Sequence, residues 1–369
     1  MGTMRKERIK VNGKEYEFDS YFVQANGQRL HCVEAGKGPL VLLVHGFPEI
    51  WYVWRYQMVA LAEAGYRVVA FDTRGYGRSS QPQNWADYRI TELVEDCVQL
   101  VKAVGEENAI IIGHDWGATV AWTAAWLRPD VFKGVAGLAN TFGGREIGAL
   151  PFNSDGKKRP TEIAAEIGGD DKWFYQDYFS YNDTQYAQDQ MEPDIRGWLR
   201  DGLYSWSGCP PLPEESIGVD FTKLQGEDLR QFLRNAGPSV TKFGNWREEA
   251  MGTPEVLPPW LTEEDLDIVA GAFEASGFFG GLSHYRVLDL NWELLGGIEE
   301  KITVPALYIG SDRCSATIWS GDAIAKLPQR CTDLRGIVIL KDCGHWEQLE
   351  KPEEVNAELL KFLSNVVSK

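Results

Sequence analysis

Residues 110–121 constrain the fold of this chain more than any other segment. They read Ile-Ile-Ile-Gly-His-Asp-Trp-Gly-Ala-Thr-Val-Ala, which is an apolar strand, a glycine-rich turn and the start of a helix. The turn has the Gly-x-nucleophile-x-Gly pattern of a strand-to-helix elbow, which exposes one reactive side chain above a parallel sheet. Serine is the usual occupant of the central position, but here it is Asp115. We therefore predict a parallel sheet flanked by helices, with a carboxylate at its carboxyl edge.

An aspartate at this position changes the chemistry that the elbow can perform. A free aspartic acid has a pKa of about 3.9, so we expect Asp115 to be ionised and able to attack without help from a base. A carboxylate oxygen suits displacement at a saturated carbon that carries a strained or good leaving group. The product of that attack is an alkyl ester on the enzyme, which water must then cleave.

Buried strands and helical segments alternate on both sides of the elbow. Two or three short strands are expected in residues 8–38, before the alternation begins. Further strands are expected at 39–45, 66–72, 108–112, 131–139, 304–310 and 336–340. Helices are expected at 50–64, 90–104, 118–126 and 353–367. This order predicts an α/β fold with a mostly parallel sheet flanked by helices.

The alternation of strands and helices stops near residue 140 and resumes near residue 298. The interval has no run of buried strands and is rich in proline, glycine and aromatic residues, with a helix expected at 262–276. We interpret residues 141–297 as a helical lid, or cap, inserted into a core formed by residues 1–140 and 298–369. The length of 369 residues allows a core domain with such an insertion.

Composition excludes several classes of partner. The net charge of −17 disfavours nucleic acid and anionic membrane surfaces. No apolar run approaches the roughly 18 residues of a membrane span, and the first residues lack a secretory signal. The six cysteines are scattered, without the spacing of a zinc site. We expect a cytoplasmic protein without metal, cofactor, nucleic acid or membrane, and a homodimer is left open.

Two histidine-containing loops are candidates for the same sheet edge as Asp115. The motif that begins at His45 follows a buried strand, and its Phe47 N–H can face a developing oxyanion together with the N–H of Trp116. The alternative is a tight turn that needs the glycine and proline of this motif. His345 also follows a strand and can take a proton from water. The alternative for His345 is a structural role.

The acid that would orient His345 is expected in the loop after the strand at 304–310. This loop reads Gly-Ser-Asp-Arg-Cys-Ser over residues 310–315, and Asp312 is its only carboxylate. The order nucleophile, acid, histidine along the chain is that of the α/β-hydrolases. The alternative is that Asp312 only caps the loop.

Taken together, these motifs resemble the epoxide hydrolases of the α/β-hydrolase fold. The resemblance covers most of the chain and rests on residues 45–55, 72–80, 113–118 and 344–346. It implies that Asp115 opens a small epoxide, expected to be apolar, to an alkyl ester on the enzyme. Water activated by His345 then releases a vicinal diol, and no metal or cofactor takes part.

The resemblance extends to two tyrosines of the lid. Residues 173–179 and 280–286 match the segments that carry the family's two proton-donating tyrosines, which implies Tyr175 and Tyr285 as donors. A phenol can protonate or polarise a leaving alkoxide. The resemblance favours Tyr175 over Tyr178, which lies three residues past the matched position. We expect His114 and Trp116 to shape the floor of the pocket.

The chain departs from the family at one position. Aligned without a gap from residues 305–307 to 317–319, the family's acid position falls on Cys314, and Asp312 lies two residues early. We expect the loop to be shifted so that Asp312 reaches His345. In the other two accounts, Cys314 occupies the place of the acid and leaves His345 poorly oriented, or the chain has lost turnover.

Two other functions remain open at this point. A haloalkane dehalogenase uses the same Asp–Trp elbow and the same ester chemistry, with the halide held by indole N–H groups. A ligand-binding member of the fold without catalysis would also be compatible with Cys314. A serine esterase is disfavoured because no serine occupies the elbow.

Overall fold

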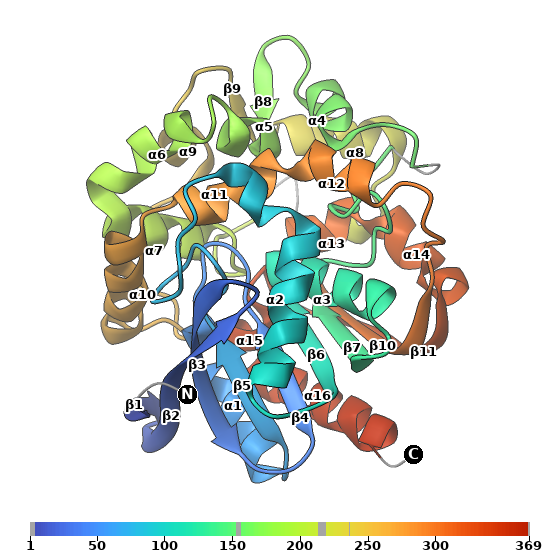
Figure 1. Ribbon diagram of the computed structural model, residues 1–369. Helices are drawn as coiled ribbons and strands as arrows, with labels where there is room; N and C mark the ends of the chain where they lie inside the picture. The colour runs from blue at the N-terminus through green and yellow to red at the C-terminus, as the bar shows by residue number, and fades with distance from the viewer. Residues whose placement is uncertain (1–3, 153–155, 213–218, 236, 368–369) are drawn as a thin grey trace.

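The computed structural model describes residues 4–152, 156–212, 219–235 and 237–367, and its centre is one large sheet (Figure 1). The nine strands of this sheet have the order β1-β2-β3-β5-β4-β6-β7-β10-β11. Their bounds are β1 Arg5–Val11, β2 Lys14–Ala25, β3 Gln28–Gly36, β4 Leu40–Val44, β5 Arg67–Phe71, β6 Ala109–His114, β7 Phe132–Leu138, β10 Ile302–Ser311 and β11 Cys331–Leu340.

The sheet is antiparallel at its first edge and parallel elsewhere. Strands β1 to β3 form antiparallel hairpins and β3 pairs antiparallel with β5, whereas the pairs from β5 to β11 are parallel. All five residues of β4 are buried, which explains its continuous apolar sequence. The predicted fold class is therefore confirmed. The strands before β4 are longer than the short ones we expected, since β2 alone has 12 residues.

Helices cover both faces of the parallel part of the sheet (Figure 1). Helices α2 and α3 pack on one face, and α1 and α16 pack on the other. The helices of the core are α1 Arg55–Glu63, α2 Ile90–Ala103, α3 Trp116–Leu127, α13 Ser315–Trp319, α14 Gly321–Arg330, α15 Glu347–Glu350 and α16 Pro352–Val367, with 3₁₀ turns η1 Trp51–Trp54 and η2 Trp85–Tyr88.

The segment between β7 and β10 lies over the carboxyl ends of the parallel strands (Figure 1). Its elements are α4 Pro160–Gly168, β8 Lys172–Phe174, α5 Tyr175–Ser180, α6 Gln185–Met191, η3 Glu192–Asp194, α7 Ile195–Ser205, η5 Phe221–Lys223, α8 Gly226–Asn235, β9 Ser239–Thr241, α9 Trp246–Ala250, α10 Glu263–Ser276, α11 Phe279–Arg286 and α12 Leu288–Leu294. Strands β8 and β9 pair antiparallel as a separate small sheet that the sequence did not suggest. Ligands of open α/β sheets bind at these strand ends.

Three contacts of α10 and α11 help to fix this upper layer on the core. A Cβ atom on Gly280 of α11 would lie 2.4 Å from the Cα of Gly75, so the two backbones touch. The hydroxyl of Tyr52 donates a 2.7 Å hydrogen bond to Oδ1 of Asp265 on α10. The guanidinium of Arg55 lies 3.3 Å from the same carboxylate oxygen. Both α10 and α11 are therefore held directly by core residues.

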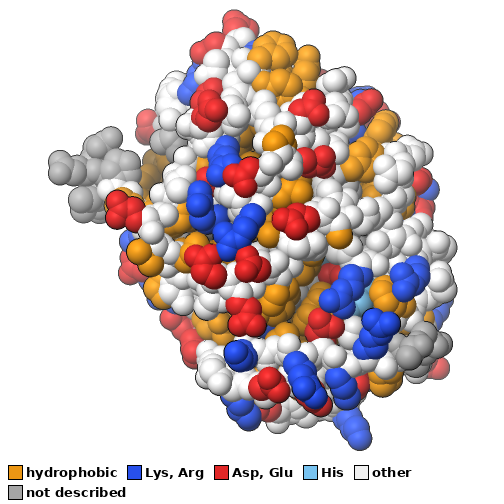
Figure 2. All heavy atoms as spheres, turned by 90° about the vertical axis from the view of Figure 1, so that its left-hand side faces the viewer, with side chains coloured by type: hydrophobic (Ala, Val, Ile, Leu, Met, Phe, Trp, Pro, Cys, Tyr) orange, Lys and Arg blue, Asp and Glu red, His pale blue; other side chains and the backbone are white. Residues whose placement is uncertain are grey.

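Acidic and basic side chains are interspersed over the face shown in Figure 2. Arg196 on α7 contacts both Glu263 and Asp267 of α10, so this surface charge also joins two helices of the upper layer. No helix among the described residues has the length and apolar character needed to cross a membrane.

Candidate active site

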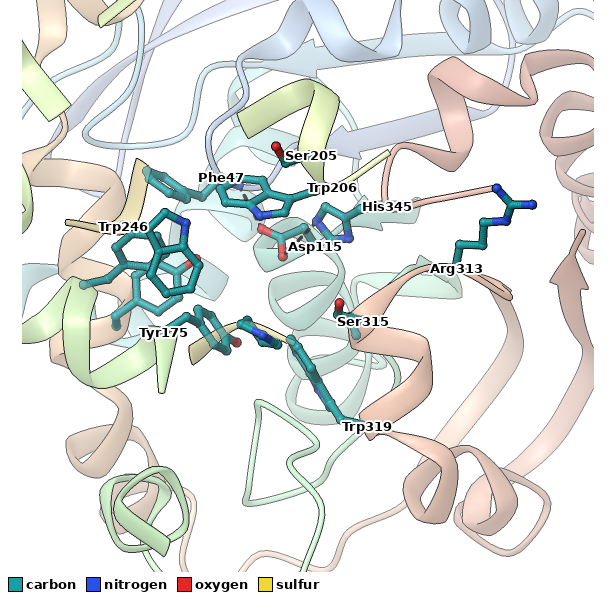
Figure 3. Close-up of a pocket in the computed structure, with 14 residues that line it drawn as sticks. Phe47, Asp115, Tyr175, Ser205, Trp206, Trp246, Arg313, Ser315, Trp319 and His345 are labelled. Atoms are coloured by element: carbon teal, nitrogen blue, oxygen red, sulfur yellow. Dashed lines mark hydrogen bonds and ion pairs between the residues drawn. The ribbon is translucent and has the colours of Figure 1, made fainter. Parts of the chain in front are cut away.

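The elbow between β6 and α3 holds Asp115 in a conformation that a non-glycine residue rarely adopts. Its φ is 52° and its ψ is −120°, outside the regions favoured by L-residues. The chain packs tightly around this bend, because a Cβ atom on Gly117 would lie 2.0 Å from the carbonyl oxygen of Val44. The sharp bend carries the Asp115 side chain into the cavity beneath the cap (Figure 3).

The two oxygens of the Asp115 carboxylate have different neighbours. The Phe47 N–H donates a 2.9 Å hydrogen bond to Oδ1, and Nε2 of His345 lies 3.6 Å from Oδ2. Burial alone would favour the neutral acid. The imidazoles of His345 and His114 and the Phe47 N–H outweigh burial and lower the pKa of Asp115 below its usual value. Asp115 is therefore a carboxylate at neutral pH.

His345 lies between this carboxylate and a cysteine. Its backbone N–H donates a 2.8 Å bond to the carbonyl of Trp206 in the cap. Its ring nitrogen Nδ1 lies 3.2 Å from Sγ of Cys314, while Nε2 faces Asp115. Burial opposes a charge on the ring, but Cys314 and Asp115 together raise the pKa of His345 well above its usual value.

The expectation that Asp312 reaches His345 is wrong. Oδ1 of Asp312 accepts a 3.5 Å bond from the Cys343 N–H, and Oδ2 lies 3.6 Å from Nζ of Lys341. The cause is that β10 runs to Ser311 and the Asp312 N–H still bonds to Leu340. The turn therefore comes late, and the residue that faces the imidazole is Cys314 at the N-cap of α13.

Both tyrosines implied by the resemblance line the same cavity as Asp115. Tyr175 begins α5, Tyr285 lies on α11, and their ring centroids are 5.6 Å apart at an angle of 84°. Burial is the main reason that the pKa of each phenol is raised, so both are protonated at neutral pH. The hydroxyl of Tyr178 instead donates to Gln190 within the cap, and Tyr178 is not among the cavity residues.

The cavity has a volume of about 120 Å³, and half of the residues that line it are Phe, Tyr or Trp. In Figure 3, Tyr175 and Trp319 lie across the space from Asp115 and His345. Further aromatic side chains that line it are Phe47, Phe179, Trp206, Trp246 and Tyr285. Among the residues that the structure describes, no group of three or more His, Cys, Asp or Glu side chains is placed to hold a metal ion.

Trp116, which was expected to shape the pocket floor, and His45 are not among the residues that line the cavity of Asp115. The indole of Trp116 packs against Tyr285, with the ring centroids 5.2 Å apart. Nδ1 of His45 donates to the Gly46 carbonyl at 2.9 Å, and its Nε2 accepts a bond from the Thr73 N–H. His45 therefore supports the loop that carries the Phe47 N–H. Both side chains are buried.

His114 is enclosed by two carboxylates that the sequence reasoning did not single out. Its Nδ1 lies 2.9 Å from Oε1 of Glu49, and its Nε2 lies 3.4 Å from Oε2 of Glu347. Nε2 also donates to the carbonyl of His345 at 2.7 Å. Burial opposes protonation, but the two glutamates raise the pKa of His114 to about 10. His114 is thus an imidazolium at neutral pH.

Glu49 also fixes the turn that holds the oxyanion donor, since its Oε2 accepts a 2.6 Å bond from the Gly46 N–H. A signal for this cluster existed, because Glu49 directly follows the motif at 45–48 and Glu347 lies two residues after His345. Sequence reasoning missed it because only the fold shows that these two loops meet beneath the elbow.

Fold and site together define the class: an α/β-hydrolase with an aspartate at the elbow. A family model described as the alpha/beta hydrolase fold matches residues 39–190. Epoxide hydrolase B of Mycobacterium tuberculosis is 43% identical over 350 residues, covering 93% of this chain and 98% of that protein. Bifunctional epoxide hydrolase 2 of Sus scrofa is 31% identical, covering 93% of this chain and 54% of that protein.

Solved structures agree with these relatives. An epoxide hydrolase from an endophytic Streptomyces superposes with a TM-score of 0.83 at 39% identity, covering 95% of this chain and 97% of that one. Epoxide hydrolase A from Mycobacterium thermoresistibile gives a TM-score of 0.76 at 35% identity, covering 94% and 98%. The chain belongs to the epoxide hydrolase family of the α/β-hydrolase fold. The resemblance seen in the sequence is thereby confirmed.

Proposed function

We propose that this protein hydrolyses a small-molecule epoxide to a vicinal diol through an ester on Asp115. One observation carries the assignment: the Asp115 carboxylate is held by the Phe47 N–H and by His345 below two protonated phenols in one cavity. The phenols favour an epoxide over a haloalkane, because an epoxide oxygen leaves as an alkoxide that needs a proton and a halide does not.

The first half-reaction opens the ring. Tyr175 and Tyr285 donate hydrogen bonds to the epoxide oxygen, and Oδ2 of Asp115 attacks the less hindered ring carbon. The carbon–oxygen bond breaks, and a tyrosine hydroxyl gives its proton to the alkoxide. Because Asp115 is already ionised, this step needs no general base.

The second half-reaction cleaves the ester. Nε2 of His345 takes a proton from water, and the hydroxide attacks the carboxyl carbon of Asp115. The charge that develops on Oδ1 is stabilised by the N–H groups of Phe47 and Trp116, and losing one such donor typically costs about 2.7–4 kcal/mol. Collapse of this intermediate expels an alkoxide, which takes the proton from His345 and leaves as the diol. The carboxylic acid that remains on Asp115 gives its proton back to the tyrosinate, which restores both the carboxylate and the phenol.

The remaining expectations are part of the same proposal. Residues 141–297 act as the cap, since both tyrosines and much of the aromatic lining lie there. That lining supports an apolar epoxide as the substrate. All six cysteines are free, which is typical of a reducing, cytoplasmic location. A homodimer stays a prediction that size-exclusion chromatography with light scattering would test.

Two variants test the proposed function. Asp115→Asn removes the nucleophile and is expected to abolish diol formation. His345→Gln removes the base, so incubation with an epoxide should trap an adduct of substrate mass on Asp115, visible by mass spectrometry of the intact protein and its peptides. Diol formation by Asp115→Asn at the wild-type rate, or halide release from haloalkanes faster than epoxide turnover, would contradict the assignment.

A further inference from the structure

A cysteine occupies the place from which a carboxylate would orient the catalytic imidazole. Sγ of Cys314 is fully buried and lies 3.2 Å from Nδ1 of His345. The opposite ring nitrogen lies 3.6 Å from Oδ2 of Asp115. Among the described residues no other side chain forms a hydrogen bond with Nδ1. Once Asp115 is esterified and carries no charge, sulfur is therefore the atom that decides which ring nitrogen carries the proton.

The position of that proton decides whether His345 can act as a base. A base needs a free lone pair on Nε2, which requires that the proton sits on Nδ1. A neutral thiol that donates to Nδ1 leaves the proton on Nε2, the wrong tautomer for accepting a proton from water. A thiolate accepts from the Nδ1–H and leaves Nε2 free. A wrong tautomer can cost about 10⁴ in rate in the best-studied triad.

We propose that Cys314 acts as a thiolate positioning residue that keeps His345 in the tautomer required for ester hydrolysis. This inference rests on the proposed function and concerns only its second half-reaction. Sγ of Cys314 and the imidazole of His345 form one proton-sharing pair across the 3.2 Å contact. When the pair holds two protons, Nε2 is blocked; when it holds one, that proton bridges Nδ1 and Sγ, and Nε2 can accept a proton from water.

Other ionisable groups around this pair lie at the elbow, on α5, on β10 and in the loop after β11. Asp115 and His114 belong to the elbow, and the ring centroid of His114 lies 4.9 Å from that of His345. Tyr175 of α5 and Tyr308 of β10 both interact electrostatically with Cys314, as does the Cys343 thiol.

The side chain of Arg313, next to Cys314 in the chain, bonds to other groups. The Arg313 guanidinium donates to the Gly208 carbonyl and pairs with Asp342. Once the ester has formed, Asp115 carries no charge. The thiolate is then the one anion in contact with the imidazole ring among the described side chains.

The pair has a kinetic consequence. A thiol is a weaker acid than a carboxylic acid, so Cys314 leaves Nε2 of His345 free less readily than a carboxylate in the same place would. Ring opening, which does not use this state, proceeds normally. The ester is therefore expected to accumulate during turnover, and its hydrolysis is expected to become faster as the pH rises.

Quenched-flow mass spectrometry with styrene oxide measures the two steps separately. For Cys314→Ser, whose hydroxyl does not ionise, ester formation should stay within about twofold of wild type while ester hydrolysis falls at least tenfold. For Cys314→Asp, hydrolysis at pH 7 should rise at least tenfold, and its pH profile should move to lower pH. Cys331→Ser, a buried thiol at the start of β11, is the matched control and should change neither step.

Either of two results overturns the inference. One is that Cys314→Ser, with wild-type thermal stability, hydrolyses the ester at the wild-type rate and with the wild-type pH profile. The other is a wild-type hydrolysis rate that does not change with pH between 6 and 9. If wild-type protein forms no ester at all, the proposed function fails instead, so the two failures are distinct.

Discussion

The two carboxylate oxygens of Asp115 are expected to have different fates during turnover. Oδ1 is held by the Phe47 N–H, so Oδ2 attacks and leaves with the diol. In ¹⁸O-water, the diol of a single turnover should contain no heavy oxygen, and one heavy oxygen should remain on the Asp115 peptide. Gas chromatography with mass spectrometry measures both. Heavy oxygen in the first diol would mean that water attacks the epoxide directly.

The cap tyrosines should affect only ring opening. Tyr175→Phe and Tyr285→Phe each remove one proton donor, so each should slow ester formation by about 10²–10⁴. The double variant should form no measurable ester. Tyr178→Phe is the control, because the Tyr178 hydroxyl bonds to Gln190 rather than facing the cavity. Pre-steady-state ester formation is the readout, and unchanged rates in both single variants would remove these tyrosines from the reaction.

At this scale the sequence predicted which residues gather in the site better than it predicted their partners. Asp115 and His345 follow strands whose carboxyl ends share one edge, so their proximity follows from the strand pattern. The contact of Asp312 could not be inferred in the same way. A strand that continues to Ser311 shifts the turn, and no residue pattern marks where pairing between two strands stops.

The buried imidazolium of His114 joins the end of β6 to the turn at Glu49 and to the start of α15, and it should make stability depend on pH. The pKa of His114 rises from about 6.5 in an unfolded chain to about 10 in the folded protein. The stabilisation is complete below pH 6.5 and is lost as the pH rises towards 10. The free energy of unfolding should therefore fall by about 1–3 kcal/mol between pH 6.5 and pH 9.

Glu347→Gln removes one partner of His114 and should make this fall with pH shallower. Glu353→Gln, at an exposed position on α16, makes the same change in charge away from the cluster and should keep the wild-type slope. Urea denaturation at several pH values measures the slopes. Equal slopes for wild type and Glu347→Gln would show that His114 is not the group responsible.

Helices and strands with a clear apolar or capping pattern in the sequence were predicted well, and those without such a pattern were not. Strand β4 is buried on both faces, so its sequence is continuously apolar and unmistakable. Helix α10 begins with a capping box at Thr262 and Asp265, and its predicted span is close to the observed one. Strands β8 and β9 have only three residues each, too few to show any periodicity.

For the whole molecule, the contact of α11 with the core should matter for both stability and catalysis. Gly280→Ala places a Cβ against the Gly75 backbone, which has no flexible side chain to yield. We expect a loss of about 1–3 kcal/mol and slower ester formation, because Tyr285 lies on the same helix. Gly271→Ala on α10 meets nothing within 4 Å and should keep or raise stability.

The midpoint of thermal unfolding and the pre-steady-state rate measure these two effects. If Gly280→Ala unfolds and reacts like wild type, the backbone contact between α11 and Gly75 does not hold the cap in place.

The arrangement of the two layers followed from the strand pattern, because the strands on either side of the inserted segment join one sheet. How the upper layer is packed did not follow, since it depends on such close backbone contacts.

The boundary between the sheet and the layer above it also divides the proposed chemistry. The groups that we propose for ester cleavage are Asp115, His345, Cys314 and the Phe47 N–H, and all lie outside the segment between β7 and β10. The tyrosines that we propose as donors to the ring oxygen lie on α5 and α11, within that segment. Changes in the upper layer can therefore alter which epoxides are accepted while the machinery that regenerates the enzyme stays intact. A lineage could diversify its substrates by varying this layer alone.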